Sequence, residues 1–506
     1  MARAQAGIRL LSASALPKPA KRPIAKPTSI RDPFAVLHIS TRGEAPALSF
    51  SDALLAGLAR DGGLYLPESF PTLDADEIAG FAGKPYAQVA QCVLGALSDG
   101  DIEGKALSEM IAQAYASFRH PAVCPLTQLG DNLFVLELFH GPTLAFKDVA
   151  MQLLGRLMDH VLTLRGARAT IVGATSGDTG GAAIDAFKGL KNVDVFILYP
   201  QGRVSDVQRR QMTTVEAHNV HAIAIDGTFD DCQNLLKALF NHHAFRDEIG
   251  LSGVNSINWA RIAAQVVYYF TSAVALGAPG RKVSFSVPTG NFGDVLAGFV
   301  AKRMGLPVER FLIGTNSNDI LARTLTEGVY EMRGVHATTS PSMDIQISSN
   351  FERLLFDAHG RDGAAIRGLM DSLKQSGRFE IGPEPLARIR AEFDATAIDE
   401  AKVAAEIGAT WAQAGYLLDP HTAIGVAAAR EGLERDPATP MIVLGTAHPA
   451  KFPAAVKAAS GVVPALPAHL ADLMDRKERF TPMPNDQTKL ESFIRQHARA
   501  VRGAAA

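Results

Sequence analysis

An α/β fold with a mainly parallel sheet covered by helices on both faces is predicted for most of this 506-residue chain. From about residue 131, short apolar runs alternate with stretches whose apolar residues are spaced three and four apart. The short runs are apolar at nearly every position, which is typical of strands buried on both faces. Glycine-rich turns follow several of these runs, and ligands of such folds bind at the carboxyl ends of the strands.

The individual elements follow from these patterns in chain order. Helical spacing is clearest at 147–164. One further helix is expected after the glycine turn near residue 175 and should end at about 188, another after the glycine turn near residue 290 should end at about 304, and a third is expected at 230–240. Residues 360–440 are expected to be rich in helix. The predicted strands are 133–136, 169–172, 193–198, 220–225, 283–287, 311–314 and 441–444.

The remaining chain divides into three further segments. Residues 38–120 show helical spacing, for example at 51–58 and 86–97, and we expect a separate, mainly helical N-terminal domain there. Residues 121–470 then form the α/β region, and the polar residues 471–506 form a C-terminal extension. Residues 1–37 are basic and proline-rich, with seven Lys or Arg before the first acid, Asp32, and are expected to be a disordered tail.

Composition excludes several classes of protein. Hydrophobic residues make up 47% and charged residues 20%, as in ordinary soluble enzymes, and the net charge of −2 gives no reason to expect a nucleic acid or a membrane as partner. The uncharged stretch 262–280 contains polar residues and ends in Gly and Pro, so we expect a buried helix and not a membrane span. The three cysteines, Cys92, Cys124 and Cys232, form no CxxC pair and indicate reduced thiols in the cytoplasm. No metal site is predicted.

Lys147 is the most informative residue, in the run His-Gly-Pro-Thr-Leu-Ala-Phe-Lys-Asp at 140–148. Apolar neighbours and a Gly-Pro turn place this lysine where it loses solvent. Desolvation lowers the pKa of an ammonium group, and a neutral amine forms a Schiff base with an aldehyde. The alternative is an ordinary solvated lysine at the start of a helix.

Two glycine-rich turns offer anion sites. The turn 173–181, Gly-Ala-Thr-Ser-Gly-Asp-Thr-Gly-Gly, joins a strand to a helix, and the turn 290–294, Gly-Asn-Phe-Gly-Asp, does the same. Backbone N–H groups at such helix starts bind phosphate or carboxylate. Neither turn is a Walker A loop, and each alone is also compatible with a plain strand–helix turn. A desolvated lysine together with a phosphate cradle indicates pyridoxal phosphate.

The segment 444–452, Leu-Gly-Thr-Ala-His-Pro-Ala-Lys-Phe, follows the last strong strand. Thr446 places a hydroxyl at a strand end, where it can hydrogen-bond a pyridine nitrogen. His448 and Lys451 are candidate anion ligands, and an ordinary helix-entry loop is the alternative for both.

Taken together, these motifs resemble the threonine synthase family, pyridoxal-phosphate enzymes of fold type II, whose fold is similar to that of tryptophan synthase β. The most specific matches are Ala-Phe-Lys-Asp, Ser-Gly-Asp-Thr-Gly and Thr-Ala-His-Pro-Ala-Lys-Phe. The resemblance runs from about residue 38 to 452 and includes 39–43, 61–65, 139–143, 145–148, 174–180, 255–261, 290–294 and 445–452.

The resemblance implies a role for each motif. Lys147 would hold pyridoxal 5'-phosphate as a Schiff base, the turn Gly290, Asn291, Phe292, Gly293 and Asp294 would surround its phosphate, and Thr446 would face its ring nitrogen. The substrate would be bound by Thr175, Ser176, Gly177, Asp178, Thr179 and Asn255, with Arg203, Arg261 and Lys451 as candidates for its phosphate.

The implied reaction converts O-phospho-L-homoserine and water into L-threonine and phosphate, by γ-elimination of phosphate and addition of water at Cβ. The alternatives are a phospho-lyase or a serine/threonine dehydratase with the same cofactor, and a non-catalytic pyridoxal-phosphate-binding relative. A monomer or a homodimer is compatible with the sequence.

Overall fold

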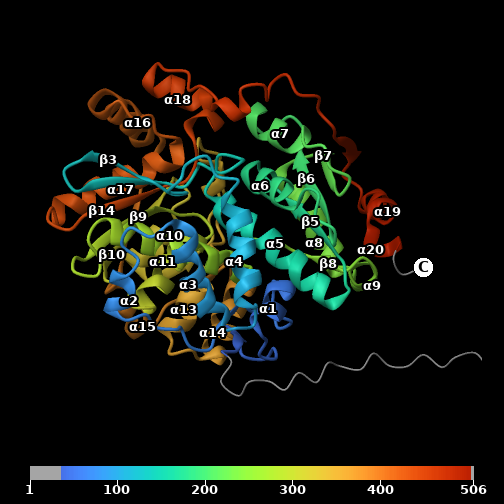
Figure 1. The fold of residues 1–506 in the computed structure, drawn as a ribbon, viewed down its shortest axis with the longest axis horizontal. Helices are drawn as coiled ribbons and strands as arrows, with labels where there is room; N and C mark the ends of the chain where they lie inside the picture. Colours follow the sequence, from blue (N-terminus) through green and yellow to red (C-terminus); the bar gives the residue numbers. More distant parts are fainter. Residues whose placement is uncertain (1–35, 503–506) are drawn as a thin grey trace, which may run out of the picture. The chain divides into compact units, whose positions relative to one another are not determined.

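Two parallel sheets form the framework of the computed structural model, which describes residues 36–502 (Figure 1). The tail predicted at 1–37 lies almost wholly outside this range. The first sheet has the order β13 (Phe393–Ala397), β10 (Val308–Thr315), β9 (Val283–Pro288), β14 (Met441–Gly445), β4 (Leu133–Glu137) and β3 (Leu126–Gly130), and its β3–β4 pair alone is antiparallel. The second sheet has the order β15 (Thr481–Pro484), β7 (Val220–Asp226), β6 (Val193–Pro200), β5 (Ala169–Ala174) and β8 (Leu251–Ser252), and its strands are all parallel.

The predicted α/β class and its seven strands are therefore confirmed. Strands β6, β9 and β14 are buried at every residue, as their continuous apolar sequences require. The helices of this region are α5 (Lys147–Arg165), α6 (Asp178–Phe187), α7 (Asp206–Thr213), α8 (Phe229–Asn241), α9 (His243–Glu248), α10 (Trp259–Ala275), α11 (Gly293–Arg303) and α12 (Ile320–Glu327).

The N-terminal segment is mainly helical, as predicted, and packs against α5 and α10 (Figure 1). It contains β1 (His38–Ser40), α1 (Phe50–Ala56), β2 (Tyr65–Pro67), α2 (Ala75–Ala79), α3 (Tyr86–Ser98) and α4 (Gly104–Tyr115), in which β1 and β2 form a short antiparallel pair. Both strands have only three residues, too few for an alternating pattern to be visible in the sequence.

The long apolar stretch after residue 259 is a buried helix, as expected. Helix α10 begins at Trp259, is capped by the Asn258 side chain, and places Tyr268 and Phe270 in the interior between the N-terminal helices and α11. No helix within residues 36–502 combines the length and the apolarity needed to cross a membrane.

The second half of the chain alternates helices with short strands. Its elements are β11 (Val329–Glu331), a 3₁₀ turn η1 (Pro341–Met343), α13 (Phe351–Ala358), α14 (Gly363–Ser376), β12 (Arg378–Glu380), α15 (Pro383–Arg390), α16 (Glu400–Ala414), α17 (Pro420–Arg435), η2 (Pro449–Lys451), α18 (Pro453–Ser460) and η3 (Ala468–Leu470).

The polar segment after residue 470 contains regular structure that its composition does not predict. Strand β15 adds to the edge of the second sheet, where its two prolines need no ladder partner on the outer side. Helix α19 (Gln487–His497) and α20 (Arg499–Arg502) follow, and α19 packs on α8.

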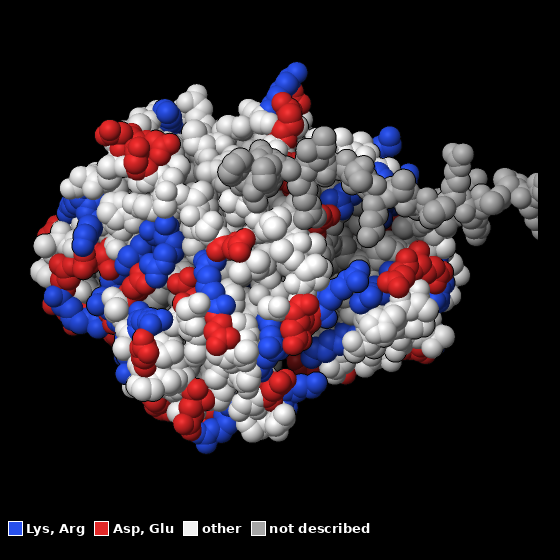
Figure 2. All heavy atoms as spheres, turned by 90° about the horizontal axis from the view of Figure 1, so that it is seen from below, with Lys and Arg blue, Asp and Glu red and all other residues white. Residues whose placement is uncertain are grey.

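Charged side chains of both signs lie close together on the face shown in Figure 2. This arrangement agrees with the small net charge and shows no extended field of one sign on that face.

Candidate active site

Lys147, Thr446 and Gly290 follow three adjacent strands of the six-stranded sheet, namely β4, β14 and β9. Because these strands are parallel, their carboxyl ends meet at one edge of the sheet. Two backbone bonds join the first two loops: the N–H of Phe146 donates to the carbonyl of Thr446 at 2.8 Å, and that of His448 donates to Leu144 at 3.0 Å. The lysine and the threonine hydroxyl are thus held on one backbone scaffold.

Local interactions fix the turn that introduces Lys147. The Asp148 carboxylate reaches back and accepts from the N–H of Thr143 at 2.8 Å and from its hydroxyl at 2.6 Å. Leu144 adopts a left-handed conformation with φ 62°, and helix α5 then starts without a side-chain cap. Burial raises the pKa of Asp148 to about 6. Asp148 is therefore a structural residue of the lysine turn.

The Lys147 side chain is only 9% exposed. Its Nζ donates to Oδ2 of Asp178 at 3.2 Å and to the Ser342 hydroxyl at 3.5 Å, and it lies 4.6 Å from the centre of the Phe146 ring. Burial lowers the pKa of Lys147, an effect that Asp178 opposes and that the Lys451 cation reinforces. The expected desolvated lysine is therefore what the structure shows.

Asp178 joins Lys147 to a second buried lysine. Lys451 is fully buried, and its ammonium donates to Oδ1 of Asp178 at 3.0 Å, to Oε1 of Gln211 at 3.0 Å and to the carbonyl of Thr143 at 2.6 Å. An ammonium group has three N–H donors, so these protein partners use all of them. Burial alone would raise the pKa of Asp178, but the two lysines hold it well below its usual range.

The turn that follows β5 is built around Thr175. Its hydroxyl accepts from the N–H groups of Gly177 and Gly180, each at 2.9 Å. Gly177 has φ 142°, and a Cβ there would lie 2.4 Å from Gln208, so the position requires glycine. Gln208 in turn donates to Oδ1 of Asp178 at 2.9 Å. Ser176 and Thr179 are partly exposed.

The turn after β9 has the features of a phosphate cradle. Its Gly290 and Asn291 carbonyls accept from Ser348 (2.6 Å) and Asn350 (3.1 and 3.0 Å), and Phe292 starts α11 in a left-handed conformation without a side-chain cap. The N-cap residue therefore gives the first N–H groups of α11 no side-chain partner, and only that of Val295 is seen to donate to a side chain, Oδ1 of Asp294 at 3.0 Å, within the described residues. The start of α11 thus suits an anion. The fifth residue, Asp294, is buried, and burial raises its pKa to about 6.

Thr446 provides a direct test of whether the site fits pyridoxal phosphate. Its hydroxyl is buried and has no hydrogen-bond partner among residues 36–502, although its N–H bonds to Thr422 at 3.1 Å. A buried hydroxyl without a partner is costly, and a pyridine nitrogen would supply that partner. The residues present therefore fit the cofactor.

The expected substrate cations are placed differently from one another. Arg261 is buried and donates to the carbonyl of Val254 at 2.9 Å, and its Nε has no partner within the residues that the structure describes. Burial lowers its pKa to about 10. It also acts electrostatically on Lys147. Arg203 is exposed and interacts with Asp231 instead. Asn255 is also exposed. The Asn350 side chain donates to the carbonyl of the next residue in its loop, Ser256.

Sequence reasoning missed Ser342 and the pair Asp419–His421. Ser342 touches Lys147, and His421 bonds to the backbone of Ser342. The sequence Asp419-Pro-His-Thr at the start of α17 contains a helix-capping signal, an Asp followed by Pro. This signal could have located Asp419 and His421, but not their contact with Ser342.

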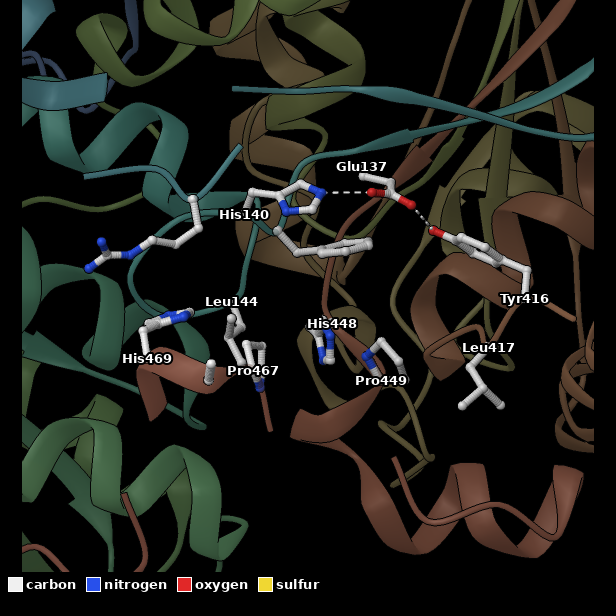
Figure 3. Close-up of a pocket in the computed structure, with 12 residues that line it drawn as sticks. Glu137, His140, Leu144, Tyr416, Leu417, His448, Pro449, Pro467 and His469 are labelled. Carbon is white, nitrogen blue, oxygen red and sulfur yellow. Dashed lines mark hydrogen bonds and ion pairs between the residues drawn. The ribbon is translucent and has the colours of Figure 1, made fainter. Parts of the chain in front are cut away.

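A cavity of about 570 Å³ lies beside these loops (Figure 3). Glu137 bonds there to His140 at 2.6 Å and to the Tyr416 hydroxyl at 2.9 Å. Leu144 and His448 line the cavity, whereas Lys147 does not, so it is distinct from the surroundings of the lysine amine. The lining residues are Arg119, Glu137, Phe139, His140, Leu144, Tyr416, Leu417, His448, Pro449, Pro467, Ala468 and His469.

Comparisons with known proteins agree with this geometry. The family models for the threonine synthase N terminus, for pyridoxal-phosphate-dependent enzymes and for the threonine synthase C-terminal region match residues 37–115, 122–445 and 422–494. A threonine synthase of Pseudomonas aeruginosa is 54% identical over 91% of this chain and 98% of its own.

Solved structures give the same result. A threonine synthase from Brucella melitensis with bound pyridoxal phosphate has a TM-score of 0.90 and 63% identity, covering 92% of this chain and 100% of its own. The yeast threonine synthase has a TM-score of 0.87 and 39% identity, covering 92% and 99%. These similarities extend over the lysine, both turns and the Thr446 loop, and this chain belongs to the threonine synthase family of pyridoxal-phosphate-dependent enzymes with fold type II.

Proposed function

We propose that this chain converts O-phospho-L-homoserine and water into L-threonine and phosphate, the last step of threonine biosynthesis, at the site around Lys147. Membership of the family makes the chain a pyridoxal-phosphate-dependent lyase that acts on a small molecule. The observation that carries the proposal is the desolvated Lys147 amine at the same strand ends as the partnerless Thr446 hydroxyl.

The cofactor would be held at three points. Lys147 would bind its aldehyde carbon, Thr446 would hydrogen-bond its ring nitrogen, and the turn Gly290, Asn291, Phe292 and Gly293 would hold its phosphate, with Asp294 next to the turn. When bound, pyridoxal phosphate supplies an electron sink for charge that develops at the substrate carbons.

Lys147 is the proposed catalytic base. Once the substrate amine takes its place, the free Nζ can remove and return protons at Cα and Cβ of the substrate. A lowered pKa suits this role, because a base must be neutral at the operating pH to accept a proton. Asp178 lies 3.2 Å away and would stabilise the ammonium form after each transfer.

The second cation of the site supports Asp178. Lys451 keeps that carboxylate ionised in a buried place, which prevents the proton of Lys147 from passing permanently to Asp178. We therefore assign Lys451 to charge balance at Asp178, because its three donors are used by the protein.

Substrate groups are assigned by chemistry. We propose that Thr175, Ser176, Gly177 and Thr179 form the wall that receives the substrate carboxylate, and that Asn255 lies at its edge. Asp178 would face the substrate amine from the side of Lys147. Arg261 is the preferred partner of the substrate phosphate, since its Nε is buried without a partner, and exposed Arg203 is the second candidate.

Further assignments rest on the sequence. We propose a tail at 1–37, a helical domain at 38–120, a catalytic region of two subdomains at 121–470 and an extension at 471–506. We also propose a cytoplasmic monomer or homodimer.

The test is product analysis. Purified protein is incubated with O-phospho-L-homoserine, and phosphate and L-threonine are measured together. Equal amounts of both support the proposal. Phosphate with an α-keto acid and no threonine would indicate a phospho-lyase. Formation of an α-keto acid when serine or threonine is supplied instead would indicate a dehydratase. No turnover of any of these substrates would indicate a non-catalytic relative. Lys147→Ala must abolish any product, whereas Lys282→Ala, which removes an exposed partner of Glu309, must not.

A further inference from the structure

A short turn outside the sequence motifs lies against the catalytic amine. Ser342, in η1, has its hydroxyl 3.5 Å from Nζ of Lys147 and 3.4 Å from Oδ2 of Asp178. Its carbonyl oxygen would lie 2.9 Å from a Cβ at Gly290. Ser342 thus occupies the space between the lysine and the proposed phosphate turn.

A buried carboxylate–imidazole pair anchors this turn. The Ser342 N–H donates to Nε2 of His421 at 3.3 Å, and Nδ1 of His421 lies 2.7 Å from Oδ2 of Asp419. Acceptance at Nε2 requires that this nitrogen carry no proton, so the imidazole proton is on Nδ1 and is donated to Asp419. The pair thereby has a defined tautomer and polarity.

Contacts with Asp419 and with the Phe452 ring hold the His421 imidazole in one orientation. Asp419 also accepts from the N–H groups of His421 at 2.9 Å and Thr422 at 3.0 Å, which caps α17. The Phe452 ring lies 4.8 Å from the imidazole, and both pair members are almost fully buried. A ring held in this way can position what it bonds.

We propose that Ser342 is a further residue of the catalytic centre, and that His421, oriented by Asp419, is a positioning residue that holds the Ser342 hydroxyl at the Lys147 nitrogen. The proposal deepens the function proposed above, on which its catalytic part rests.

The chemistry of a hydroxyl gives Ser342 a role that Asp178 cannot have. A hydroxyl accepts a hydrogen bond from an ammonium group and donates one to a neutral amine, whereas a carboxylate only accepts. Lys147 must alternate between these two forms during turnover. Ser342 can therefore stay bonded to the nitrogen in both forms, beside the charges of Asp178, Lys451 and Arg261 that also act on it.

The alternative is that His421 only stabilises the fold. A measurement on the Lys147 nitrogen itself separates the two. We suggest reductive dimethylation of the full-length, cofactor-free protein over a range of pH, with the labelling of the Lys147 peptide followed by mass spectrometry. Because no cofactor or substrate is present, the result does not depend on whether the enzyme makes threonine.

The variants form a double-mutant cycle with controls. Ser342→Ala removes the hydroxyl, and His421→Phe removes the acceptor while keeping a ring against Phe452. Ser342→Thr keeps the hydroxyl, and His421→Gln keeps an acceptor. Ser286→Ala is the matched control, because it removes a 2.7 Å bond to Gly425 of the same helix α17 without touching η1.

Ser342→Ala is expected to lower the labelling midpoint of Lys147, because the hydroxyl bonds the charged ammonium form more strongly than the neutral amine. The labelling rate below the midpoint should therefore rise, by about threefold for so long a bond. His421→Phe is expected to shift the labelling midpoint in the same direction. The double variant should shift it no further than Ser342→Ala alone. Ser342→Thr and Ser286→Ala should keep the parent midpoint, and His421→Gln should restore at least half of the shift. In the loaded enzyme, kcat should fall with KM unchanged.

Two results would overturn the proposal. One is a labelling midpoint of Lys147 in Ser342→Ala that equals the midpoint in the parent protein. The other is an effect of His421→Phe that is as large in the Ser342→Ala background as in the parent, which would mean that His421 does not act through Ser342.

Discussion

The Lys147 ammonium lies 3.2 Å from the Asp178 carboxylate, and both groups are buried at the carboxyl ends of the strands. A buried charge is costly unless a nearby charge of opposite sign compensates it. Because Lys451 lies on the other side of the carboxylate, the set is one anion between two cations. Burial, reinforced by the excess of positive charge, lowers the pKa of the Lys147 amine and makes it easier to deprotonate.

Asp178→Asn is therefore expected to destabilise the protein by about 3–5 kcal/mol, because two buried lysines lose the anion that they share. Thermal unfolding of the cofactor-free protein measures this. Glu309→Gln, which removes the exposed partner of Lys282, should cost no more than about 1 kcal/mol. An equal loss of unfolding free energy in both variants would show that Asp178 stabilises the protein no more than an exposed ion pair does.

Stability in acid should depend on Asp178 in a defined direction. Its folded-state pKa is held well below the ordinary value of 3.8. The resulting stabilisation is fully present above pH 3.8 and is lost progressively as the pH falls below that value toward the folded-state pKa. Between pH 5 and 2.5 the melting temperature of Asp178→Asn should thus fall less steeply than that of the parent. Parallel curves would contradict the assignment.

Thr446→Val should separate cofactor binding from folding. The hydroxyl has no partner in the described part of the chain, so its loss should change the stability of the cofactor-free protein by no more than about 1 kcal/mol. Affinity for pyridoxal phosphate should fall, and the visible absorption band should shift. The contrasting variant is Thr422→Val, which loses bonds to Thr446 and Asp419 and should cost about 1–3 kcal/mol of stability. An unchanged spectrum in Thr446→Val would remove Thr446 from the cofactor site.

Gly290→Ala is expected to weaken pyridoxal phosphate binding at least tenfold. The added Cβ would lie 2.9 Å from the Ser342 carbonyl and 3.3 Å from the Met343 Cα, both backbone atoms that cannot rotate away. Equilibrium binding of the cofactor measures the effect. Gly95→Ala is the control, because its Cβ meets nothing within 4 Å inside α3 and should stabilise the helix by about 0.5–1 kcal/mol. Parent-like binding by Gly290→Ala would argue against the proposed cradle.

The framework could be predicted from sequence because its strands are continuously apolar. Runs such as Val193–Pro200 are buried at every position and follow from composition alone. Strands β8, β13 and β15 were not predicted, since they are short or polar and are strands through pairing with their neighbours. The burial of Lys147 was predicted correctly from its apolar flanks.

The surroundings of the lysine could be predicted only in part. The sequence singles out Lys451 as a cation near the site, but its three bonds to Asp178, Gln211 and Thr143 depend on contacts between distant segments. Ser342 is 195 residues from Lys147, in a loop without a motif, and nothing in its local sequence distinguishes it from other serines. Tertiary packing alone brings it to the amine.

Borohydride reduction followed by peptide mass spectrometry shows which lysine carries the cofactor. The purified, loaded protein is reduced, digested and searched for the mass of the reduced cofactor. We expect the cofactor on the peptide that contains Lys147, and no modification in Lys147→Ala. Stable attachment to another lysine, or the same labelling in Lys147→Ala, would contradict it.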